Sequence, residues 1–398
     1  MALLIVLRSD ASKEHSVVTQ TDPTIALLED LVAIDSVNPS LVAGAPGEAE
    51  IARRIAAECT AAGLEVTVSE IAPGRPNVVA VLDGPNPGPT LMFCGHLDTV
   101  GVAGMEHPFR PIHRDGRLYG RGAQDMKGGV AAMVGAAQQI AEQNVCTRGR
   151  LIVAAVVDEE HASLGAEALA ARWRADAAVV TEPTDLDIAV AHKGFEWVRV
   201  ETLGRAAHGS RPRDGRDAIL RMGRVLSRLE SLDRRLQSQR PHALLGTGSL
   251  HASIINGGRE LSSYPDRCSL QIERRTLPGE AVGAGFQEVQ AILDRLRRAD
   301  EDFVCDANLV FGRAAYELEP SHPLPEMLTR AAETAGCRPR RVGMSFWSDA
   351  AILSAAGVPT VLFGPGGAGL HSVEEYVRIE DVRVCRDALV ELARGFFR

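Results

Sequence analysis

The chain has 398 residues, 45% of them hydrophobic and 24% charged, which suits two packed domains and excludes a disordered or fibrous protein. Its formal net charge of −9 would repel a phosphate backbone, so we expect no nucleic-acid partner. Seven scattered cysteines, odd in number and without a CxxC pair, argue against a disulfide framework and a thiolate zinc site. They favour a cytoplasmic protein.

The first residues form a short apolar run at positions 2–7. The run lacks a basic leader, is shorter than the ~7–15 residues of a secretory signal core, and is far too short to cross a bilayer. We expect a strand or a tail before a domain that begins near Asp22, with an unusual export signal as the alternative. We expect no membrane partner.

Helices and strands alternate along the first half of the chain. The run from Asp22 to Ile34 has helical periodicity and begins with Asp-Pro, a favourable helix start, and a second helix is predicted at 48–62. Nearly unbroken apolar runs are typical of strands covered on both faces, and a glycine-rich helix at 127–143 separates two of them. These runs lie at 90–94, 150–157 and 177–180. The pattern predicts an α/β domain with an interior sheet over residues 22–193.

The pattern changes near residue 194, where apolar and polar residues begin to alternate as in a sheet with one exposed face. We predict a small α+β insert over 194–307, with helices at 217–237 and 283–298. Beyond it the α/β pattern resumes, with a buried strand at 358–363 and a closing helix at 379–396. The first domain is therefore predicted to be split, with its second segment at 308–398.

Acidic and imidazole side chains follow the buried strands directly, where open α/β sheets bind ligands. His96 and Asp98 follow the strand at 90–94, and their spacing lets Asp98 orient the imidazole of a metal-bound His96. Asp125 stands just before a helix, as a ligand or as a helix cap. Three carboxylates, at positions 158–160, follow the next strand, and one can be a base and one a ligand.

Two further polar side chains complete this set. Glu182 follows the strand at 177–180, and His371 comes from the returning chain after a glycine-rich turn. Two imidazoles, one aspartate and two glutamates form a hard nitrogen and oxygen set without sulfur. Such a set suits Zn²⁺, Mn²⁺ or Co²⁺.

The motifs resemble, in order, those of the zinc aminoacylase family, which includes acetylornithine deacetylase, succinyl-diaminopimelate desuccinylase and carboxypeptidase G-type enzymes. The resemblance covers about residues 22–398. It rests on Gly-His-x-Asp-x-Val at 95–100, Asp-Met-Lys-Gly-Gly at 125–129, Asp-Glu-Glu at 158–160, Thr-Glu-Pro at 181–183 and the late His371.

The resemblance implies a zinc-exopeptidase-like catalytic domain, with a mixed, largely parallel sheet flanked by helices, and a ferredoxin-like insert that serves as lid and dimerisation domain. It also implies two zinc ions per subunit, for which Co²⁺ or Mn²⁺ can substitute. Asp125 would bridge the ions, with His96 and Glu182 on one and Glu160 and His371 on the other. Glu159 would be the general base, with Asp158 and Glu160 as alternatives.

The insert carries further candidates that the resemblance assigns. His208 would reach the active site of the neighbouring subunit in a homodimer and bind the oxyanion. Asn256 and Arg275 would contact the acyl and carboxylate ends of the substrate. Glu273 stands where the family usually has Asp, which keeps Arg274 as an alternative to Arg275. The segment 343–349, with Gly343 and Ser345, is expected to form a specificity wall.

The sequence therefore predicts a two-zinc amidohydrolase that cleaves the N-acyl bond of a small amino-acid derivative with a free carboxylate. We expect an acetylornithine deacetylase-like enzyme or a general aminoacylase. A succinyl-diaminopimelate desuccinylase and a dipeptidase or carboxypeptidase are the alternatives within the family. An inert metal or ligand sensor is the alternative of another class, and the complete set of ligands and base disfavours it.

Overall fold

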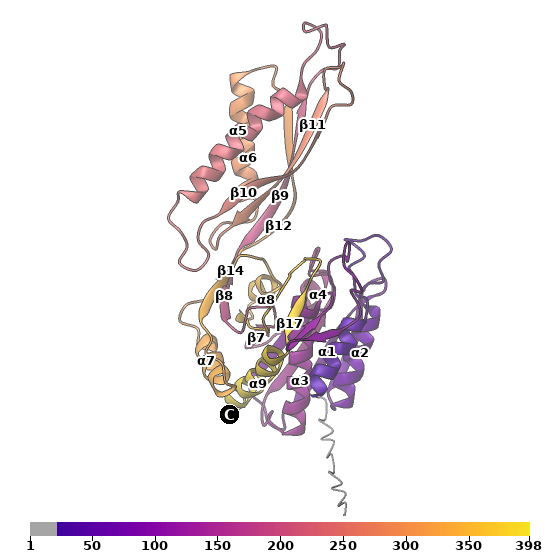
Figure 1. The fold of residues 1–398 in the computed structure, drawn as a ribbon. Helices are drawn as coiled ribbons and strands as arrows, with labels where there is room; N and C mark the ends of the chain where they lie inside the picture. Colours follow the sequence, from indigo (N-terminus) through magenta and orange to yellow (C-terminus); the bar gives the residue numbers. More distant parts are fainter. Residues whose placement is uncertain (1–21) are drawn as a thin grey trace, which may run out of the picture.

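The structure is a computed structural model that describes residues 22–398. The apolar run at 2–7 lies outside the described residues. A large α/β body carries a smaller elongated body, built from the middle of the chain, that stands on it (Figure 1). No helix in the described part of the chain is long and apolar enough to cross a membrane.

The large body is built around a mixed nine-stranded sheet. Its strands β6, β3 and β7 are neighbours and run parallel, so their carboxyl ends lie at one edge. The predicted α/β fold with a mixed sheet is confirmed. In spatial order the strands are β1 (Glu65–Ala72), β2 (Arg75–Asp83), β6 (Arg150–Val156), β3 (Thr90–His96), β7 (Ala177–Val180), β15 (Thr360–Leu362), β8 (Ile188–His192) and β13 (Tyr316–Glu317), and β14 (Arg341–Met344) pairs with β8.

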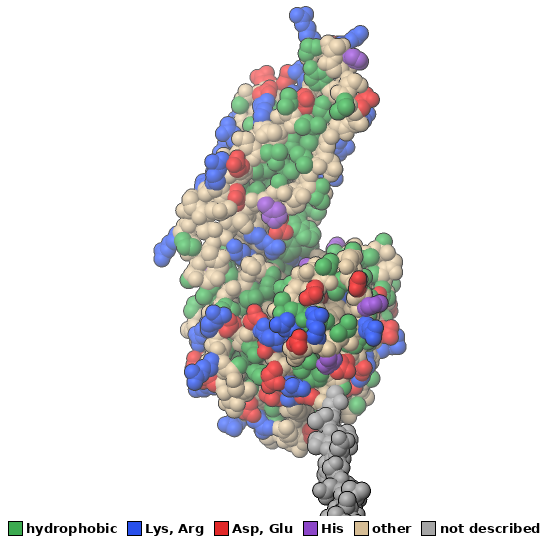
Figure 2. All heavy atoms as spheres, viewed as in Figure 1, with side chains coloured by type: hydrophobic (Ala, Val, Ile, Leu, Met, Phe, Trp, Pro, Cys, Tyr) green, Lys and Arg blue, Asp and Glu red, His purple; other side chains and the backbone are tan. Residues whose placement is uncertain are grey.

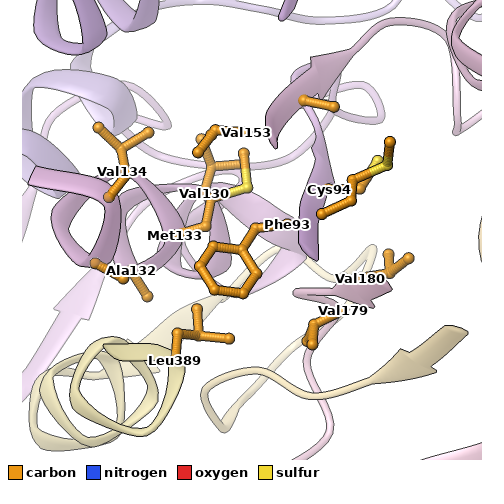
Figure 3. Close-up of a cluster of buried hydrophobic side chains, with 14 of the residues drawn as sticks. Phe93, Cys94, Val130, Ala132, Met133, Val134, Val153, Val179, Val180 and Leu389 are labelled. Carbon is orange, nitrogen blue, oxygen red and sulfur yellow. The ribbon is translucent and has the colours of Figure 1, made fainter. Parts of the chain in front are cut away.

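Helices cover the sheet and complete its core. Phe93 of β3 lies among Val130 and Met133 of α3 and Leu389 of α9 (Figure 3). Close packing requires glycine at position 129, because a Cβ atom there would lie 1.9 Å from the Thr181 carbonyl oxygen. The helices of this body are α1 (Pro23–Ala33), α2 (Ala49–Ala61), α3 (Gly128–Glu142), α4 (Leu164–Arg172), α7 (Leu324–Thr334), α8 (Ala350–Ala355) and α9 (Ile379–Phe396).

A small antiparallel sheet ties two distant segments together. It pairs β17 (Tyr376–Arg378) with β5 (Arg117–Tyr119), and β16 (Gly367–Ala368) and β4 (Ile112–Arg114) flank that pair. The loops that follow β5 and β16 are thereby brought to the same edge of the large sheet.

The insert, residues 194–313, has a four-stranded antiparallel sheet in the order β10-β11-β9-β12. Two helices pack on one face of the sheet around a separate apolar core, so the order of elements is ferredoxin-like. The last strand continues to Arg313, beyond the predicted boundary at 307. The elements are β9 (Gly194–Leu203), α5 (Ala218–Gln237), β10 (Ser249–Gly257), β11 (Arg267–Thr276), α6 (Ala284–Ala299) and β12 (Cys305–Arg313).

Candidate active site

Three of the predicted site segments meet at the carboxyl ends of parallel strands. His96 is the last residue of β3, Glu160 follows β6, and Glu182 follows β7. Because these strands are neighbours, their end residues lie together at one edge of the sheet. His96 and Glu182 are almost fully buried, at 2% and 4% exposure.

Asp125 lies in the π-helical turn η1 (Ala123–Lys127), and the Glu375 carboxylate holds this turn in place. That carboxylate accepts hydrogen bonds from the backbone amides of Gly122, Gln124 and Asp125 at 2.9–3.1 Å. It also pairs with Arg121 at 2.6 Å and is 1% exposed. Glu375 therefore positions Asp125, although the sequence analysis did not single it out.

Asp125 stands between the two histidines. One carboxylate oxygen lies 3.1 Å from His96 Nε2, and the other lies 3.4 Å from His371 Nε2. His371 Nε2 also lies 3.1 Å from Glu160 Oε2. Two groups of potential ligands result, one of His96, Asp125 and Glu182 and one of Asp125, Glu160 and His371, each with ligand atoms within 4.8 Å of one another.

The crowding of carboxylates has electrostatic consequences. Burial and the neighbouring Asp125 raise the pKa of Glu160 to about 6, and burial raises the pKa of Glu182 well above its usual range. Hydrogen bonds to Asp125 and Glu160 raise the pKa of His371 to about 10. Like charges held this close in a buried site are stabilised by cations, and one Glu160 oxygen has no hydrogen-bond partner among the described residues. These residues therefore fit a pair of bound metal ions.

Asp98 makes a different contact from the expected one. Its carboxylate lies 3.7 Å from the His96 ring nitrogen Nδ1, whereas the Asp98 backbone carbonyl lies 2.9 Å from it. The carboxylate instead accepts hydrogen bonds from the backbone amides of Glu159 and Glu160, both at 3.1 Å. Asn38 donates to the same carboxylate at 2.8 Å. Asp98 thus orients His96 through its main chain and holds the loop of Glu159 through its side chain.

Replacing Asp98 by asparagine is expected to lower kcat about 10- to 100-fold, the usual cost of losing a group that supports a metal ligand. The amide nitrogen of asparagine cannot accept a hydrogen bond, so the amide of Glu159 or of Glu160 would lose its acceptor. Steady-state kinetics and metal analysis of the same preparation check this. An unchanged kcat at full metal content would contradict the role of Asp98.

The three carboxylates after β6 have separate surroundings. Asp158 is fully buried and pairs with Arg75 at 2.7 Å, which leaves it no access to substrate. Glu160 contacts His371. Glu159 faces a hollow next to the candidate ligands, which we call the hollow below. Burial and the charge of Glu182 raise the pKa of Glu159 well above its usual range. The hollow is lined by Glu159, Glu160, His161, Ser163, Phe195, Trp197, Glu273, Arg275, Phe311, Arg313, Phe346, Trp347 and His371. Of the three carboxylates, Glu159 is the one that lines the hollow and pairs with neither Arg75 nor His371.

Residues of the insert differ in how close they come to this hollow. Arg275 lines it, whereas Arg274 is 1% exposed and pairs with Glu280 and Glu288. Asn256 is exposed on β10 and does not line the hollow. Glu273, which stands where the family usually has aspartate, forms an ion pair with Arg275 at 2.6 Å. The glutamate therefore helps to hold Arg275 in place.

His208 lies near the end of the insert that points away from the large body. It follows β9, whose first residues contact the hollow, and a strand of this length spans about 30 Å. Its ring is hydrogen-bonded to Ser210, and the residue is exposed. A single chain does not bring His208 to the ligands.

The segment 343–349, predicted to form a specificity wall, reaches the hollow through its two aromatic residues. Phe346 and Trp347 line the hollow, whereas Gly343 and Ser345 do not. Gly343 instead packs against the insert, since a Cβ there would lie 2.5 Å from Leu245 Cδ2. The insert contributes further aromatic side chains to the hollow, from Phe195, Trp197 and Phe311, which the sequence analysis missed.

A fully buried histidine behind this wall predicts a pH effect on stability. His192 packs edge-on to Trp347, with ring centroids 6.1 Å apart, and burial lowers its pKa to about 4. The unfolded chain binds this proton near pH 6.5, so the contribution of His192 to stability is complete above pH 6.5 and is lost as the pH falls towards 4. Between pH 7 and pH 4.5 the free energy of unfolding of the parent falls. In a His192→Phe variant this fall is expected to be smaller by about 2 kcal/mol.

Urea unfolding at both pH values measures this difference. Equal losses in the parent and the variant would show that His192 is protonated in the folded protein. The hydrogen bond from the ring to the Lys193 carbonyl is absent in the variant at every pH, so it cancels from the comparison.

Two histidines and two glutamates surround a shared aspartate at the parallel edge of an α/β sheet that carries a ferredoxin-like insert. This arrangement is that of a hydrolase of the metallopeptidase class. The chain belongs to peptidase family M20/M25/M40, whose sequence profile matches residues 92–395. The predicted family is confirmed, and the protein is a hydrolase that acts on amide bonds.

Curated relatives carry several substrate names. The chain is 33% identical over 332 residues to an acetylornithine deacetylase of Myxococcus xanthus, which covers 80% of this chain and 84% of the relative. It is 29% identical to the N-formyl-4-amino-5-aminomethyl-2-methylpyrimidine deformylase of Bacillus subtilis, covering 80% and 83%. It is also 29% identical to a succinyl-diaminopimelate desuccinylase of Gluconacetobacter diazotrophicus, covering 92% and 94%.

Solved structures share the fold. The aminopeptidase PepT of Bacillus cereus is similar with a TM-score of 0.78 at 21% identity, covering 94% of this chain and 98% of that one. Human carnosine dipeptidase 1 is similar with a TM-score of 0.71 at 19% identity, covering 94% and 96%.

Proposed function

We propose that the protein is a two-zinc amidohydrolase that removes the acyl group from a small N-acyl-L-amino acid. The position of Asp125 carries this proposal, because each of its carboxylate oxygens faces a different histidine. His96 and Glu182 would hold one ion, and Glu160 and His371 the other. Co²⁺ or Mn²⁺ suits the same nitrogen and oxygen ligands. The seven cysteines are unpaired, and six of them are buried, which agrees with the expected cytoplasmic location.

The side chains of the site have different roles in hydrolysis. Metal ions held by His96, Asp125, Glu160, Glu182 and His371 would supply activation of a water molecule and polarisation of the carbonyl of the scissile amide. Glu159 then accepts the proton of the attacking water and passes it to the leaving amine, a role that suits a carboxylate with a raised pKa. Arg275, with a planar fork of donors, binds the carboxylate of the substrate.

Release of free amine from a panel of substrates tests this function. The panel contains N-acetyl amino acids, N-succinyl-diaminopimelate and dipeptides, each assayed with zinc, with cobalt and after chelation. We expect chelator-sensitive hydrolysis of N-acetyl amino acids. Preferred cleavage of the succinyl compound or of dipeptides would assign one of the alternative family activities, and no turnover by a protein with two bound metals would contradict the proposal.

A homodimer through the insert would complete the site. β10 is an edge strand, and its Ile254 and Ile255 are 50% and 51% exposed. Leu220 of α5 and Leu261 near β10 are still more exposed, and Figure 2 shows a band of hydrophobic side chains along the insert. An unpaired apolar edge is a template for pairing with a second strand. Pairing of two inserts would let His208 of each chain serve the other.

A heterodimer of two inactive variants tests this exchange. One chain carries Glu159→Ala and the other His208→Ala, with different affinity tags so that the heterodimer can be isolated. If His208 acts on the neighbouring site, one of the two sites is complete and the heterodimer has about half the parent activity. If His208 acts within its own chain, both sites are defective and the heterodimer is inactive, like the two variant homodimers.

A further inference from the structure

Four aromatic rings form one cluster in the hollow beside the metal ligands. The rings belong to Phe195, Trp197, Phe311 and Trp347, and neighbouring centroids are 5.1–6.1 Å apart. The chain has three tryptophans and an aromatic content of 4%, so two of its three indoles stand at this one place. All four rings line the hollow, and Trp197 is 38% exposed whereas Phe195 is buried, so the cluster borders open space on one side.

Hydrogen bonds fix both indoles. The Trp347 ring nitrogen donates to the Ala314 carbonyl at 3.0 Å, and the Trp197 ring nitrogen donates to Glu273 at 3.0 Å. With their polar atoms satisfied, these rings offer flat apolar faces to a ligand.

Besides Glu159, Glu160 and the histidines, the charged side chains that line the hollow are Arg275, Arg313 and Glu273. Arg275 lies over the Phe195 ring at 5.5 Å, and Arg313 lies over Phe311 at 5.0 Å and Trp347 at 5.7 Å. Glu273 is already paired with Arg275. Arg313 is likewise paired with Glu167 at 2.7 Å. A cationic side chain such as that of ornithine would therefore find, among the described residues that line the hollow, no unpaired carboxylate beyond Glu159 and Glu160.

The size of the hollow suits one ring. Its volume is about 170 Å³, close to the ~150 Å³ cavity that binds benzene in an apolar protein interior. Metal ligands, arginines and aromatic rings line the same space. A ligand with its amide at the metal ligands would place its neighbouring groups against the arginines and the rings.

We infer that the preferred substrate is an N-acyl-L-amino acid with an aromatic side chain. Its carboxylate binds Arg275, and its ring stacks in the cluster of Phe195, Trp197, Phe311 and Trp347. This inference rests on the proposed deacylase function and narrows it, because it places an aromatic ring where acetylornithine has an amine.

Competing substrates test the inference. We expect kcat/KM for N-acetyl-L-phenylalanine and N-acetyl-L-tryptophan to exceed that for N-acetyl-L-ornithine at least about tenfold, since ring stacking and burial contribute more than 1.4 kcal/mol. A preference for acetylornithine or for N-acetyl-L-alanine would overturn the inference and leave the proposed function intact. Hydrolysis of none of these amides would overturn the proposed function itself.

Paired tryptophan variants test the cluster directly. Trp347→Leu is expected to lower kcat/KM for N-acetyl-L-phenylalanine at least about tenfold more than kcat/KM for N-acetyl-L-alanine. Trp173→Leu is the matched control, because Trp173 caps α4 away from the hollow. Equal effects of Trp347→Leu on both substrates would show that the ring supports the fold and does not bind substrate.

Calorimetric binding gives a readout that is independent of turnover. The probe is N-acetyl-L-phenylalanine, titrated into the metal-loaded Glu159→Gln variant with and without Trp347→Leu. We expect the second substitution to weaken binding at least about tenfold. Unchanged affinity would overturn the placement of the ring.

Discussion

Replacing Glu159 by alanine is expected to lower kcat by about 10²- to 10⁴-fold, the usual contribution of a general base. Glu159 is the acidic residue after β6 that is held neither by Arg75 nor by His371, and its backbone amide is fixed by Asp98. Its removal takes away the proton acceptor and leaves the two groups of metal ligands unchanged.

The measurement pairs kcat with metal content. We expect two metal ions per chain in the Glu159→Ala variant, as in the parent, and Glu333→Ala, an exposed substitution on α7, should keep full activity. A variant that retains metal and most of its kcat would transfer the role of base to another residue. A variant that loses metal would instead make Glu159 a ligand.

Replacing Asp125 by alanine is expected to abolish turnover and to weaken binding of both metal ions. The loss should exceed the ~10- to 100-fold that removal of a ligand's hydrogen-bond partner costs, because Asp125 is the one residue common to both ligand groups. Elemental analysis after dialysis against a weak chelator counts the bound ions.

Asp306→Ala, on the exposed side of β12, is the matched control. Loss of one ion with retention of the other would show that Asp125 serves a single metal. The metal content of a Glu182→Ala variant should then be compared with that of Asp125→Ala, because Glu182 belongs only to the group that contains His96.

Three of the five candidate ligands could be placed from the sequence because they follow a local rule. Buried parallel strands are recognisable as apolar runs, and the polar residues after them meet at one edge of the sheet. His96, Glu160 and Glu182 satisfy that rule. Asp125 and His371 come from loops that no periodicity describes, and the family resemblance implied their roles.

The supporting contacts could not be predicted, because they join segments far apart in the sequence. Glu375 binds a turn 250 residues earlier, and Asn38 binds Asp98 across 60 residues. The aromatic cluster likewise draws on β9, β12 and the loop after β14. Tertiary packing alone decides these neighbours.

The sequence of β11 itself distinguishes Arg274 from Arg275. Successive side chains of a strand point to opposite faces, and β11 alternates buried residues with less buried ones from Cys268 onwards. Arg274 shares the buried face of Cys268 and Leu270, so the parity of the strand places Arg275 on the other face. Strand parity therefore distinguishes the two arginines from the sequence alone.

The distance of His208 from its own metal ligands has a consequence for how the enzyme is handled. If the partner supplies this histidine, no single polypeptide contains a complete catalytic apparatus, and specific activity obeys mass action between subunits. Dilution below the dissociation constant of the dimer would then inactivate a folded, metal-loaded protein, and concentration would restore it. Substitutions along the exposed edge of β10 would impair catalysis in the same way, although they touch neither metal nor substrate.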